Sequence, residues 1–308
     1  MKKQENYQTL VITGPTACGK TALAARVARE LDGEVISADS RQVYRGMNLG
    51  TGKDYDDYVV DGVQVPYHLI DIVEAGDTYD VFSYQQDFFR VYRELKDREK
   101  FPVVCGGTGL YLEAVLRGYR LVRVPVDHSF RQSLEGKSME ELARLLAGYK
   151  TLHNKTDTDT RKRLVRALEI ARYQARYPEQ DNDLPDLSPL VVGVQIDRET
   201  RRQRITLRLR QRLEAGMIDE VKDLLEKGVS EERLMYYGLE YKYIALYLTG
   251  RLEYDEMFSG LETAIHRFAK RQMTWFRGMQ RRGIPIRWVD FHLPEEEKTA
   301  VILEWLEE

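Results

Sequence analysis

"LVITGPTACGKT", residues 10–21, joins an apolar run to a glycine-rich turn and then to a helical pattern. The turn fits G-x-x-x-x-G-K-[ST], a pattern that is specific when a strand precedes it and a helix follows. Both conditions are met, because Thr9–Thr13 predicts a buried strand and Ala22–Leu31 predicts a helix. Backbone N–H groups and the positive end of that helix would then face phosphate oxygens. The stretch therefore predicts a phosphate-binding loop, with an ordinary glycine-rich turn as the weaker alternative.

Two side chains at the end of this loop add to what its backbone offers. Lys20 supplies a full positive charge to phosphate oxygens, and the Thr21 hydroxyl is a candidate ligand for Mg²⁺. Cys18 fills a position that needs a small residue, since the motif places no base beside it. The predicted phosphate contacts are Gly14, Pro15, Thr16, Ala17, Cys18, Gly19, Lys20 and Thr21.

Strand-like runs alternate with helical patterns through the first third of the chain, which indicates a parallel sheet with helices on both faces. The further strand-like runs are Glu34–Ala38, Tyr67–Ile72, Pro102–Cys105 and, much later, Leu190–Ile196. A long helix is predicted over Phe82–Glu99. The sequence thus favours an α/β core.

A polar, helical stretch without strand-like runs extends from Asp127 to Tyr177. Because strand patterns precede and follow it, we interpret it as a helical insertion into one α/β core. The core would comprise residues 1–122 and 189–308, and the insertion residues 123–188. Beyond Arg201 the pattern is mostly helical, with breaks at Gly216, Gly228, Gly238 and Gly250.

The composition is that of a soluble globular protein. With 308 residues, 43% of them hydrophobic, the chain can bury a sizeable core. Apolar runs are too short for a membrane span and residues 1–8 are polar, so we expect no membrane association and a cytoplasmic location. Cys18 and Cys105 lie far apart and the five histidines show no ligand spacing with them, so we expect no structural zinc site.

The basic residues are clustered although the net charge is −3. One cluster alone would usually be a solvated helix face, but three in a mildly acidic protein favour a surface that binds a polyanion. The first cluster holds seven arginines between Arg198 and Arg212. The others are Arg161, Lys162, Arg163 and Arg166, and then Arg267, Lys270, Arg271, Arg277, Arg281 and Arg282.

Acidic residues follow two of the predicted strands. An ATPase needs an acid at the end of a second strand, but Pro102–Cys105 ends in two glycines, whereas Asp39 and Asp197 follow other strands. Asp39 lies where open α/β sheets bind ligands, so it could hold Mg²⁺, orient a substrate hydroxyl or accept a proton. The alternatives are a helix N-cap for Asp39 and a mere strand end for Asp197.

Five segments, in this order and at this spacing, resemble the bacterial tRNA dimethylallyltransferase family. They are "GPTACGKT" (14–21), "DSRQVYRGMNLGTGK" (39–53), "YHLIDI" (67–72), "GGTGLYLEAVLRG" (106–118) and "RFAKRQMTWFRG" (267–278). The resemblance runs from about Leu10 to Arg277, and the combination is far more specific than the phosphate loop alone. It implies a P-loop NTPase-like parallel sheet core, a small all-helical insertion domain and a largely helical C-terminal part.

The resemblance also implies a reaction: transfer of the dimethylallyl group of dimethylallyl diphosphate to N6 of adenosine 37, just 3′ of the anticodon. The tRNAs modified would be those that read codons beginning with U, and diphosphate would be released intact. Thr16, Lys20 and Mg²⁺ would neutralise the leaving group, while Asp39 would take the proton of N6. An arginine on the diphosphate is also implied; the spacing indicates Arg204, with Arg208 one turn further as the alternative.

Contacts to the tRNA anticodon stem-loop are implied on both sides of the target base, which must leave its stack to react. The implied residues are Asp39, Ser40, Arg41, Gln42, Thr108, Arg131, Lys162, Arg163, Leu164, Val165 and Arg166. One stretch, Tyr236–Gly250, departs from the family's pattern. Its tyrosines are either helix packing or tRNA contacts.

Three other functions share parts of this pattern: a P-loop small-molecule kinase, an adenylate prenyltransferase acting on free AMP or ATP, and an ATP-driven RNA-binding protein. The basic clusters and the lack of a recognisable nucleotide lid argue against the kinase. The helix with Arg163 and Arg166 favours tRNA over a free nucleotide. We expect a monomeric transferase with tRNA and dimethylallyl diphosphate as partners and Mg²⁺ as cofactor.

Overall fold

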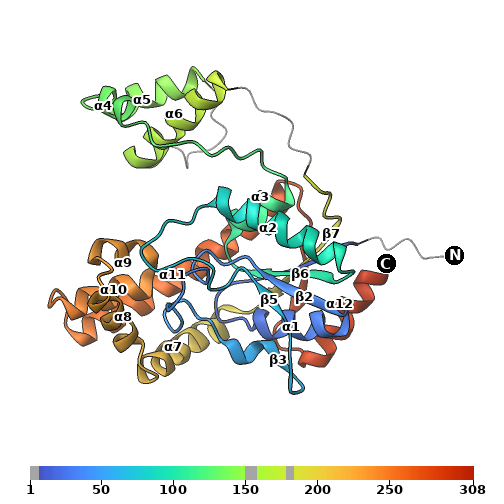
Figure 1. Cartoon of the computed structure of the whole chain (residues 1–308). Helices are drawn as coiled ribbons and strands as arrows, with labels where there is room; N and C mark the ends of the chain where they lie inside the picture. The colour runs from blue at the N-terminus through green and yellow to red at the C-terminus, as the bar shows by residue number, and fades with distance from the viewer. Residues whose placement is uncertain (1–6, 150–157, 178–183) are drawn as a thin grey trace. The chain divides into compact units, whose positions relative to one another are not determined.

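The computed structural model describes residues 7–149, 158–177 and 184–308 (Figure 1). The chain divides into two compact units. Met1–Gly118 and Pro185–Glu308 form one, here called the sheet unit, and Tyr119–Leu184 forms the other, the helical unit. The predicted insertion, residues 123–188, covers nearly the same stretch as the helical unit.

A parallel sheet of six strands, in the order β5-β2-β6-β1-β7-β8, forms the centre of the sheet unit. The predicted α/β fold class is confirmed. Its strands are β1 (Thr9–Thr13), β2 (Gly33–Ser37), β5 (Tyr67–His68), β6 (Phe101–Gly106), β7 (Pro189–Gln195) and β8 (Arg287–Asp290), and a separate hairpin pairs β3 (Val59–Val60) with β4 (Val63–Gln64). Because β1 pairs with β6 on one side and β7 on the other, the phosphate loop follows an interior strand.

Helices cover both faces of this sheet, with α1 and α12 on one face and α2 and α3 on the other (Figure 1). The strands that carry them are apolar on both faces, as a doubly covered parallel sheet requires. The helices of the unit are α1 (Lys20–Glu30), α2 (Val81–Asp97), α3 (Gly109–Leu116), α7 (Arg198–Glu214), α8 (Met217–Glu226), α9 (Glu231–Tyr237), α10 (Leu239–Leu248), α11 (Tyr254–Arg281) and α12 (Glu295–Glu307), with a short 3₁₀ helix, η1 (Tyr55–Tyr58).

The helical C-terminal part breaks at the four glycines that the sequence marks. Gly216 and Gly238 directly precede α8 and α10 with positive φ angles of 98° and 153°, which a residue without Cβ adopts easily. Tyr237 and Tyr241 are fully buried, whereas Tyr236 is 45% exposed. Helix packing therefore explains Tyr237 and Tyr241 in the stretch that departs from the family's pattern, but not the exposed Tyr236; Tyr243 and Tyr247, the other tyrosines of the stretch, are half-buried.

The helical unit consists of α4 (His128–Ser133), α5 (Met139–Ala147) and α6 (Arg161–Arg176) around a small core of leucines and alanines. Leu164 belongs to that core with no exposed surface. The implied contact between Leu164 and tRNA stays a prediction, and the structure gives its side chain a place in the core, where it faces the other helices of the unit. Val165 is partly buried against the same core.

One predicted strand is shorter than its apolar pattern. Tyr67–Ile72 was expected to be extended, but β5 ends at His68 because Leu69 and Asp71 have positive φ angles of 62° and 55°. The chain turns there, and the Asp71 carboxylate accepts hydrogen bonds from Lys53 and Tyr55. A turn that carries an ion pair between the buried Lys53 and the half-buried Asp71 thus follows the shortened strand.

Candidate active site

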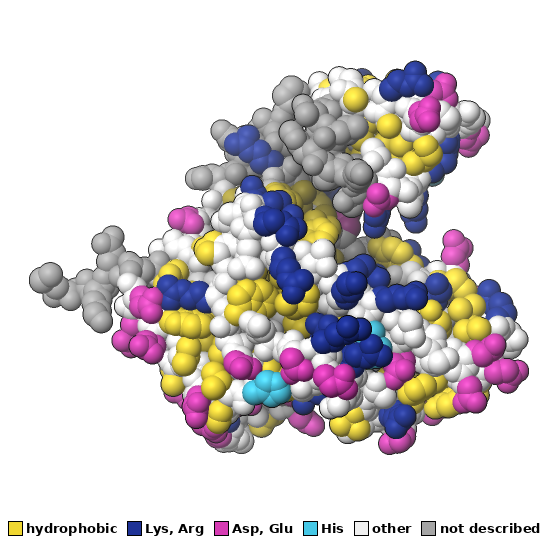
Figure 2. Space-filling view, turned by 180° about the vertical axis from the view of Figure 1, so that it is seen from behind, with side chains coloured by type: hydrophobic (Ala, Val, Ile, Leu, Met, Phe, Trp, Pro, Cys, Tyr) yellow, Lys and Arg dark blue, Asp and Glu magenta, His cyan; other side chains and the backbone are white. Residues whose placement is uncertain are grey.

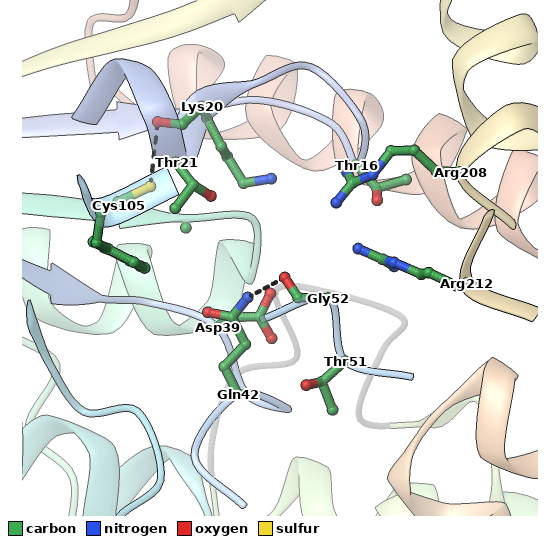
Figure 3. A pocket seen from close by; sticks show the side chains of 12 residues that line it. Thr16, Lys20, Thr21, Asp39, Gln42, Thr51, Gly52, Cys105, Arg208 and Arg212 are labelled. Atoms are coloured by element: carbon green, nitrogen blue, oxygen red, sulfur yellow. Dashed lines mark hydrogen bonds between the residues drawn. The ribbon is translucent and has the colours of Figure 1, made fainter. Parts of the chain in front are cut away.

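A polar cavity lies at the carboxyl ends of β1, β2 and β6 in the sheet unit (Figure 3). It is lined by Thr16, Lys20, Thr21, Asp39, Gln42, Thr51, Gly52, Tyr58, Cys105, Gly106, Arg208 and Arg212. Three of these side chains are cationic, and Asp39 is the single carboxylate of the lining. Such a site suits a multiply charged anion, which the three cations would bind. The Asp39 carboxylate is then left to accept a proton or to hold a cation.

The phosphate loop has the geometry that its sequence predicts. Gly14 has φ 154°, and a Cβ there would lie 2.8 Å from Cys18 Sγ and 3.2 Å from the carbonyl of Val194. Gly19 precedes α1 in a left-handed conformation, and no side chain caps the first turn of α1. The amide donors at the start of α1 are therefore free of a side-chain acceptor and point to where Lys20 and Thr21 line the cavity.

Asp39 stands in a tight turn, not at the start of a helix. Its Oδ1 accepts a hydrogen bond from the backbone N–H of Arg41 at 2.9 Å, and no helix begins between Asp39 and η1, which starts at Tyr55. The alternative of a helix N-cap is thereby excluded. Its neighbour Ser40 is held by Thr108, whose Oγ1 accepts from the Ser40 backbone N–H at 3.0 Å. Asp39 and Thr108, which lie far apart in the sequence, are thus brought to one place.

Gln272 of α11 is a site residue that the sequence did not single out. Its Oε1 accepts from the backbone N–H of Thr16 at 2.9 Å, and its Nε2 donates to the carbonyl of Gly107 at 3.0 Å. One buried amide therefore fixes the phosphate loop against the loop that carries Thr108. Its place within the quoted segment "RFAKRQMTWFRG" was the available signal.

The arginines of α7 reach the loop in two different ways. Arg204 does not line the cavity: its Nε donates to the carbonyl of Ala17 at 2.9 Å, on the loop's backbone. Arg208 and Arg212, one and two turns further, do line it, and both pair with Asp54. Burial lowers the pKa of Arg212, with the nearby Arg208 adding to the effect. The structure thus favours the alternative, Arg208, and adds Arg212, which was not predicted.

The remaining predicted groups near the sheet edge have structural partners. Burial raises the pKa of the Cys105 thiol to about 12, so this cavity residue stays protonated at neutral pH. Asp197 caps α7 by accepting from the backbone N–H of Thr200 at 2.9 Å and also contacts His292 at 2.8 Å. Asp197 does not line the cavity, so the structure favours its interpretation as a strand end over that as a metal ligand.

Of the implied tRNA contacts after Asp39, Gln42 lines the cavity, while Ser40 and Arg41 belong to the turn that Asp39 begins. The Arg41 guanidinium lies 5.2 Å from the ring centre of the exposed Tyr236. Side chains that follow Asp39 therefore extend from the cavity lining to the molecular surface.

In the helical unit, Arg131 and Arg166 both contact the buried carboxylate of Glu169, at 2.8 Å and 3.1 Å. These two arginines stabilise the unit internally, which the sequence did not reveal. Lys162 and Arg163 are exposed on α6. Among the tRNA contacts implied for the helical unit, these two are exposed charges that pair with no buried side chain.

Within the described residues, no cluster of three or more His, Cys, Asp or Glu side chains could hold a metal ion. In the same part of the chain, every helix is too short or too polar to cross a membrane.

Comparison with known proteins places this geometry in one family. A family model described as IPP transferase matches residues 42–279, and a second, described as isopentenyl transferase, matches residues 7–68. The chain is 57% identical to tRNA dimethylallyltransferase 2 of Bacteroides fragilis over 303 residues, 98% of this chain and 99% of that protein.

Solved structures are similar over the same extent. The full-length tRNA isopentenylpyrophosphate transferase of Bacillus halodurans superposes with a TM-score of 0.72 at 30% identity, covering 97% of this chain and 95% of that one. A eukaryotic dimethylallyltransferase acting on tRNA superposes with a TM-score of 0.78 over 97% of this chain and 79% of that one. At 21% identity, this second structure supports the fold alone.

Proposed function

Because the chain belongs to the tRNA dimethylallyltransferase family, we propose that it transfers the dimethylallyl group of dimethylallyl diphosphate to N6 of adenosine 37 in tRNAs that read codons beginning with U. The observation that carries the proposal is the cavity in which Asp39 is the single carboxylate among Lys20, Arg208 and Arg212. The relatives named above are prenyl-transferring enzymes of tRNA, so the kinase and the prenylation of free AMP or ATP are not retained.

The cations of the cavity provide for the leaving group. As N6 of adenine forms a bond to the allylic carbon, the bond between that carbon and the diphosphate oxygen breaks, and its electron pair leaves with the diphosphate. Lys20 and the loop amides, with Arg208 and Arg212, stabilise the charge that develops there. The Thr16 hydroxyl lines the same cavity and can donate a hydrogen bond to the anion.

Asp39 provides for the nucleophile. An exocyclic amine conjugated to a purine is a weak nucleophile, so a carboxylate that accepts its proton as the new bond forms lowers the barrier. The hydrogen bond from the Arg41 backbone N–H occupies only Oδ1, and Oδ2 remains available to the amine. Thr108 and Ser40 hold this carboxylate's segment in place.

The cavity also suits Mg²⁺, as the Thr21 hydroxyl and the Asp39 carboxylate are hard oxygen donors in the same lining. We propose Thr21 as the protein ligand that Mg²⁺ would take beside the diphosphate. The ion would add charge stabilisation to the leaving group.

A basic groove in the sheet unit supports the proposal that the acceptor is an RNA. It runs between the start of α7 and the middle of α11, and Lys and Arg side chains gather in a band across the face drawn in Figure 2. Its basic members are Arg198, Arg201, Arg202, Arg267, Lys270 and Arg277. Burial and the nearness of Arg198 and Arg277 lower the pKa of Arg201 and outweigh the opposite effect of Asp197, as expected where like charges crowd. A phosphate backbone would relieve that repulsion.

The direct test is incubation of the purified protein with radiolabelled dimethylallyl diphosphate, Mg²⁺ and one acceptor at a time. The acceptors are unmodified tRNA reading a codon that begins with U, the same tRNA with guanosine at position 37, and AMP. We expect label only in the first tRNA, with one diphosphate released for each prenyl group transferred. Label in AMP but not in tRNA, or equal labelling of the two tRNAs, would contradict the proposal.

A further inference from the structure

Residues 47–53 form one wall of the cavity, here called the wall loop. Thr51 and Gly52 line the cavity directly. The carbonyl of Gly52 accepts a hydrogen bond from Gln42 Nε2 at 3.0 Å, and Gln42 Oε1 accepts from Ser37 Oγ at 3.3 Å. Gln42 lines the cavity beside Asp39, so the position of its amide depends on where the wall loop lies.

A carboxylate from α8 holds the outer side of the wall loop. Glu220 Oε2 accepts from the backbone N–H groups of Asn48 at 2.8 Å and Leu49 at 2.7 Å, and its Oε1 accepts from that of Gly50 at 3.1 Å. The hydroxyl of Tyr241 donates to Oε1 at 2.6 Å and orients the carboxylate. Hydrogen bonds to an ionised acceptor are roughly twice as strong as neutral ones, and three consecutive amides converge on this one.

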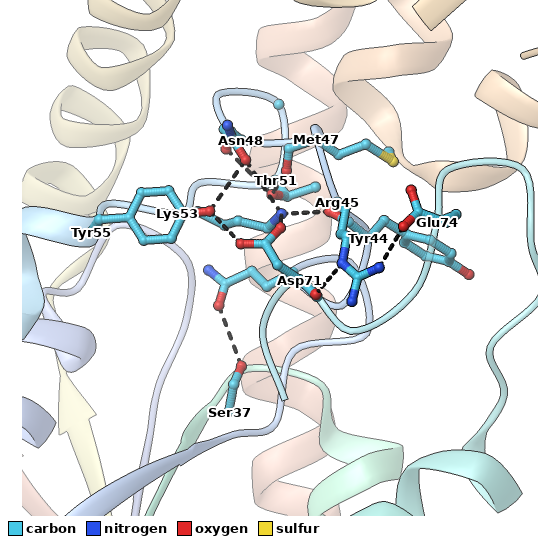
Figure 4. A network of polar contacts seen from close by, with 12 residues as sticks. Ser37, Tyr44, Arg45, Met47, Asn48, Thr51, Lys53, Tyr55, Asp71 and Glu74 are labelled. Atoms are coloured by element: carbon cyan, nitrogen blue, oxygen red, sulfur yellow. Dashed lines mark hydrogen bonds and ion pairs between the residues drawn. The ribbon is translucent and has the colours of Figure 1, made fainter. Parts of the chain in front are cut away.

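The inner side of the wall loop is fixed by a charge of the opposite sign (Figure 4). The Lys53 side chain is fully buried, and its Nζ donates to the Tyr44 carbonyl at 2.5 Å, to Asp71 Oδ1 at 2.5 Å and to Asn48 Oδ1 at 3.4 Å. Lys53, the last residue of the wall loop, therefore ties the loop to Tyr44 and Asp71 outside it and to Asn48 within it. Glu220 binds the backbone amides of the loop from α8. The two charges together define a single position for the loop.

Two observations indicate that Glu220 positions the wall loop and is not needed to hold α8 in the fold. Helix α8 is already packed by Met217, Val221 and Leu224, which are buried on its apolar face. The wall loop, in contrast, approaches α10 so closely that a Cβ on Gly50 would lie 2.6 Å from Tyr241 Cζ. Hydrogen bonds that fix the loop at this distance position the cavity wall and are not needed to attach the helix.

We propose that Glu220 is a positioning residue of the prenyl-transfer reaction: it fixes the wall loop so that Gly52 holds the Gln42 amide beside Asp39. The inference rests on the proposed function in one respect, namely that the target adenosine lies against Asp39 and Gln42. Since Glu220 acts through the loop, it affects the orientation of the acceptor base and not the binding of diphosphate at Lys20 and Arg208.

The test uses the full-length protein with Glu220→Gln, which keeps the side-chain length but replaces one acceptor oxygen with a donor that faces backbone N–H groups. The matched control is Glu226→Gln, which removes an exposed acid on the same helix whose ion pair with Lys222 is long, at 3.9 Å. For both variants kcat and KM are measured with tRNA, inorganic pyrophosphate binding is measured by calorimetry, and amide exchange is measured over residues 48–50.

We expect Glu220→Gln to lower kcat at least tenfold and to speed exchange of amides 48–50 at least tenfold, with pyrophosphate affinity within threefold of wild type and Glu226→Gln unchanged. Turnover within twofold of wild type would overturn the proposal, as would equal losses of turnover and pyrophosphate affinity accompanied by faster exchange throughout α8. The exchange readout needs no catalysis, so failure of the wild type to modify tRNA would count against the proposed function alone.

A second variant keeps the test decisive if Glu220→Gln does not fold. Gly50→Ala retains Glu220 but brings a methyl group against the Tyr241 ring, so the loop must move. We expect the same pattern, with kcat at least tenfold lower and pyrophosphate affinity preserved. Wild-type kinetics in folded Gly50→Ala would show that the position of the wall loop does not matter, which overturns the proposal.

Discussion

The basic cluster of α6 and the basic cluster in the groove between α7 and α11, whose members come from the other two sequence clusters, differ in what their charges contact. On α6, Arg161 donates to backbone carbonyls, Arg163 pairs with Asp159, and Arg166 pairs with the buried Glu169. In the groove between α7 and α11, the six basic side chains have no hydrogen bond or ion pair among the described residues. The first cluster mostly builds the helical unit, whereas the second leaves its charge available to a ligand.

A run of basic residues in a sequence shows where positive charge lies, but not whether that charge is available to bind a ligand. Arginines beside a buried acid contribute to stability, because removing one leaves a carboxylate without its partner. Arginines that crowd together without a paired acid repel one another, and binding of a polyanion relieves that repulsion. Substitutions of arginines in the helical unit should therefore lower its stability. Substitutions in the groove should lower the affinity for RNA.

The largest effect should come from removing charge in the groove. Arg202, Arg267 and Lys270 are exposed there, and their joint replacement by Gln should weaken tRNA binding on the order of 100-fold at low salt. The slope of log affinity against log salt should fall by about 3. The measurement is tRNA binding at several salt concentrations. Replacing three cations of α2, Arg90, Arg93 and Lys96, is the control, and an equal loss in that variant would remove the distinction.

The next effect should appear as stability in the helical unit. Arg131→Ala removes two hydrogen bonds from the buried Glu169 and should destabilise the unit by about 2 kcal/mol, reduced from the fully buried case because Arg131 is itself partly exposed. Arg163→Ala breaks only an exposed pair and should cost about 0.5 kcal/mol or less. Urea dependence of amide exchange in α6 reports both. Equal costs in the two variants would mean that burial of Glu169 does not matter.

A smaller effect should separate the arginines of α7. Arg208→Ala should weaken pyrophosphate binding about tenfold, because it removes a charge that lines the cavity. Arg204→Ala acts only through the Ala17 carbonyl and should change the affinity less. Calorimetry on both variants decides between them. A larger loss for Arg204→Ala would restore the assignment that the sequence spacing first indicated.

The smallest effect should be a dependence on pH. Burial disfavours the Glu169 anion, but hydrogen bonds from Arg131, the Asp127 backbone and Arg166 outweigh it and lower the pKa of Glu169. A lowered pKa contributes stability above the ordinary glutamate pKa, and this contribution is lost as pH falls through the folded value. The urea midpoint of the helical unit should therefore fall from pH 5 to pH 3, and fall less in Glu169→Gln. An identical decline in both would exclude Glu169 as the cause.

The fold was largely predictable because its signals are local. The buried strands β1, β6 and β7 are short apolar runs, and four glycines mark the helix breaks after α7. Nothing in the pattern predicted β8 and α12, which complete the sheet and cover α1. β8 has only four residues and α12 buries only Thr299 and Ile302, so neither gives a strong pattern. Their place depends on packing against β7 and α1.

The site residues that belong to a motif were predictable from the sequence. Those whose position depends on partners far away in the sequence were not. The loop, Asp39 and Thr108 meet at the cavity as their segments suggest. Which arginine of α7 faces that cavity depends on the rotation of the helix, so the spacing indicated Arg204 where the structure presents Arg208. Glu220 contacts amides 170 to 172 positions away, and no local pattern encodes such a pairing.

The most direct test of the account is the single-turnover rate of prenyl transfer in Asp39→Asn, measured together with tRNA affinity. The substitution keeps the shape of the side chain and the hydrogen bond to the Arg41 backbone, but removes the ability to take a proton. We expect a rate lower by about 100-fold or more, in the range of a general base, with tRNA and pyrophosphate affinities within threefold of wild type. An unchanged rate, or a defect confined to tRNA affinity, would contradict it.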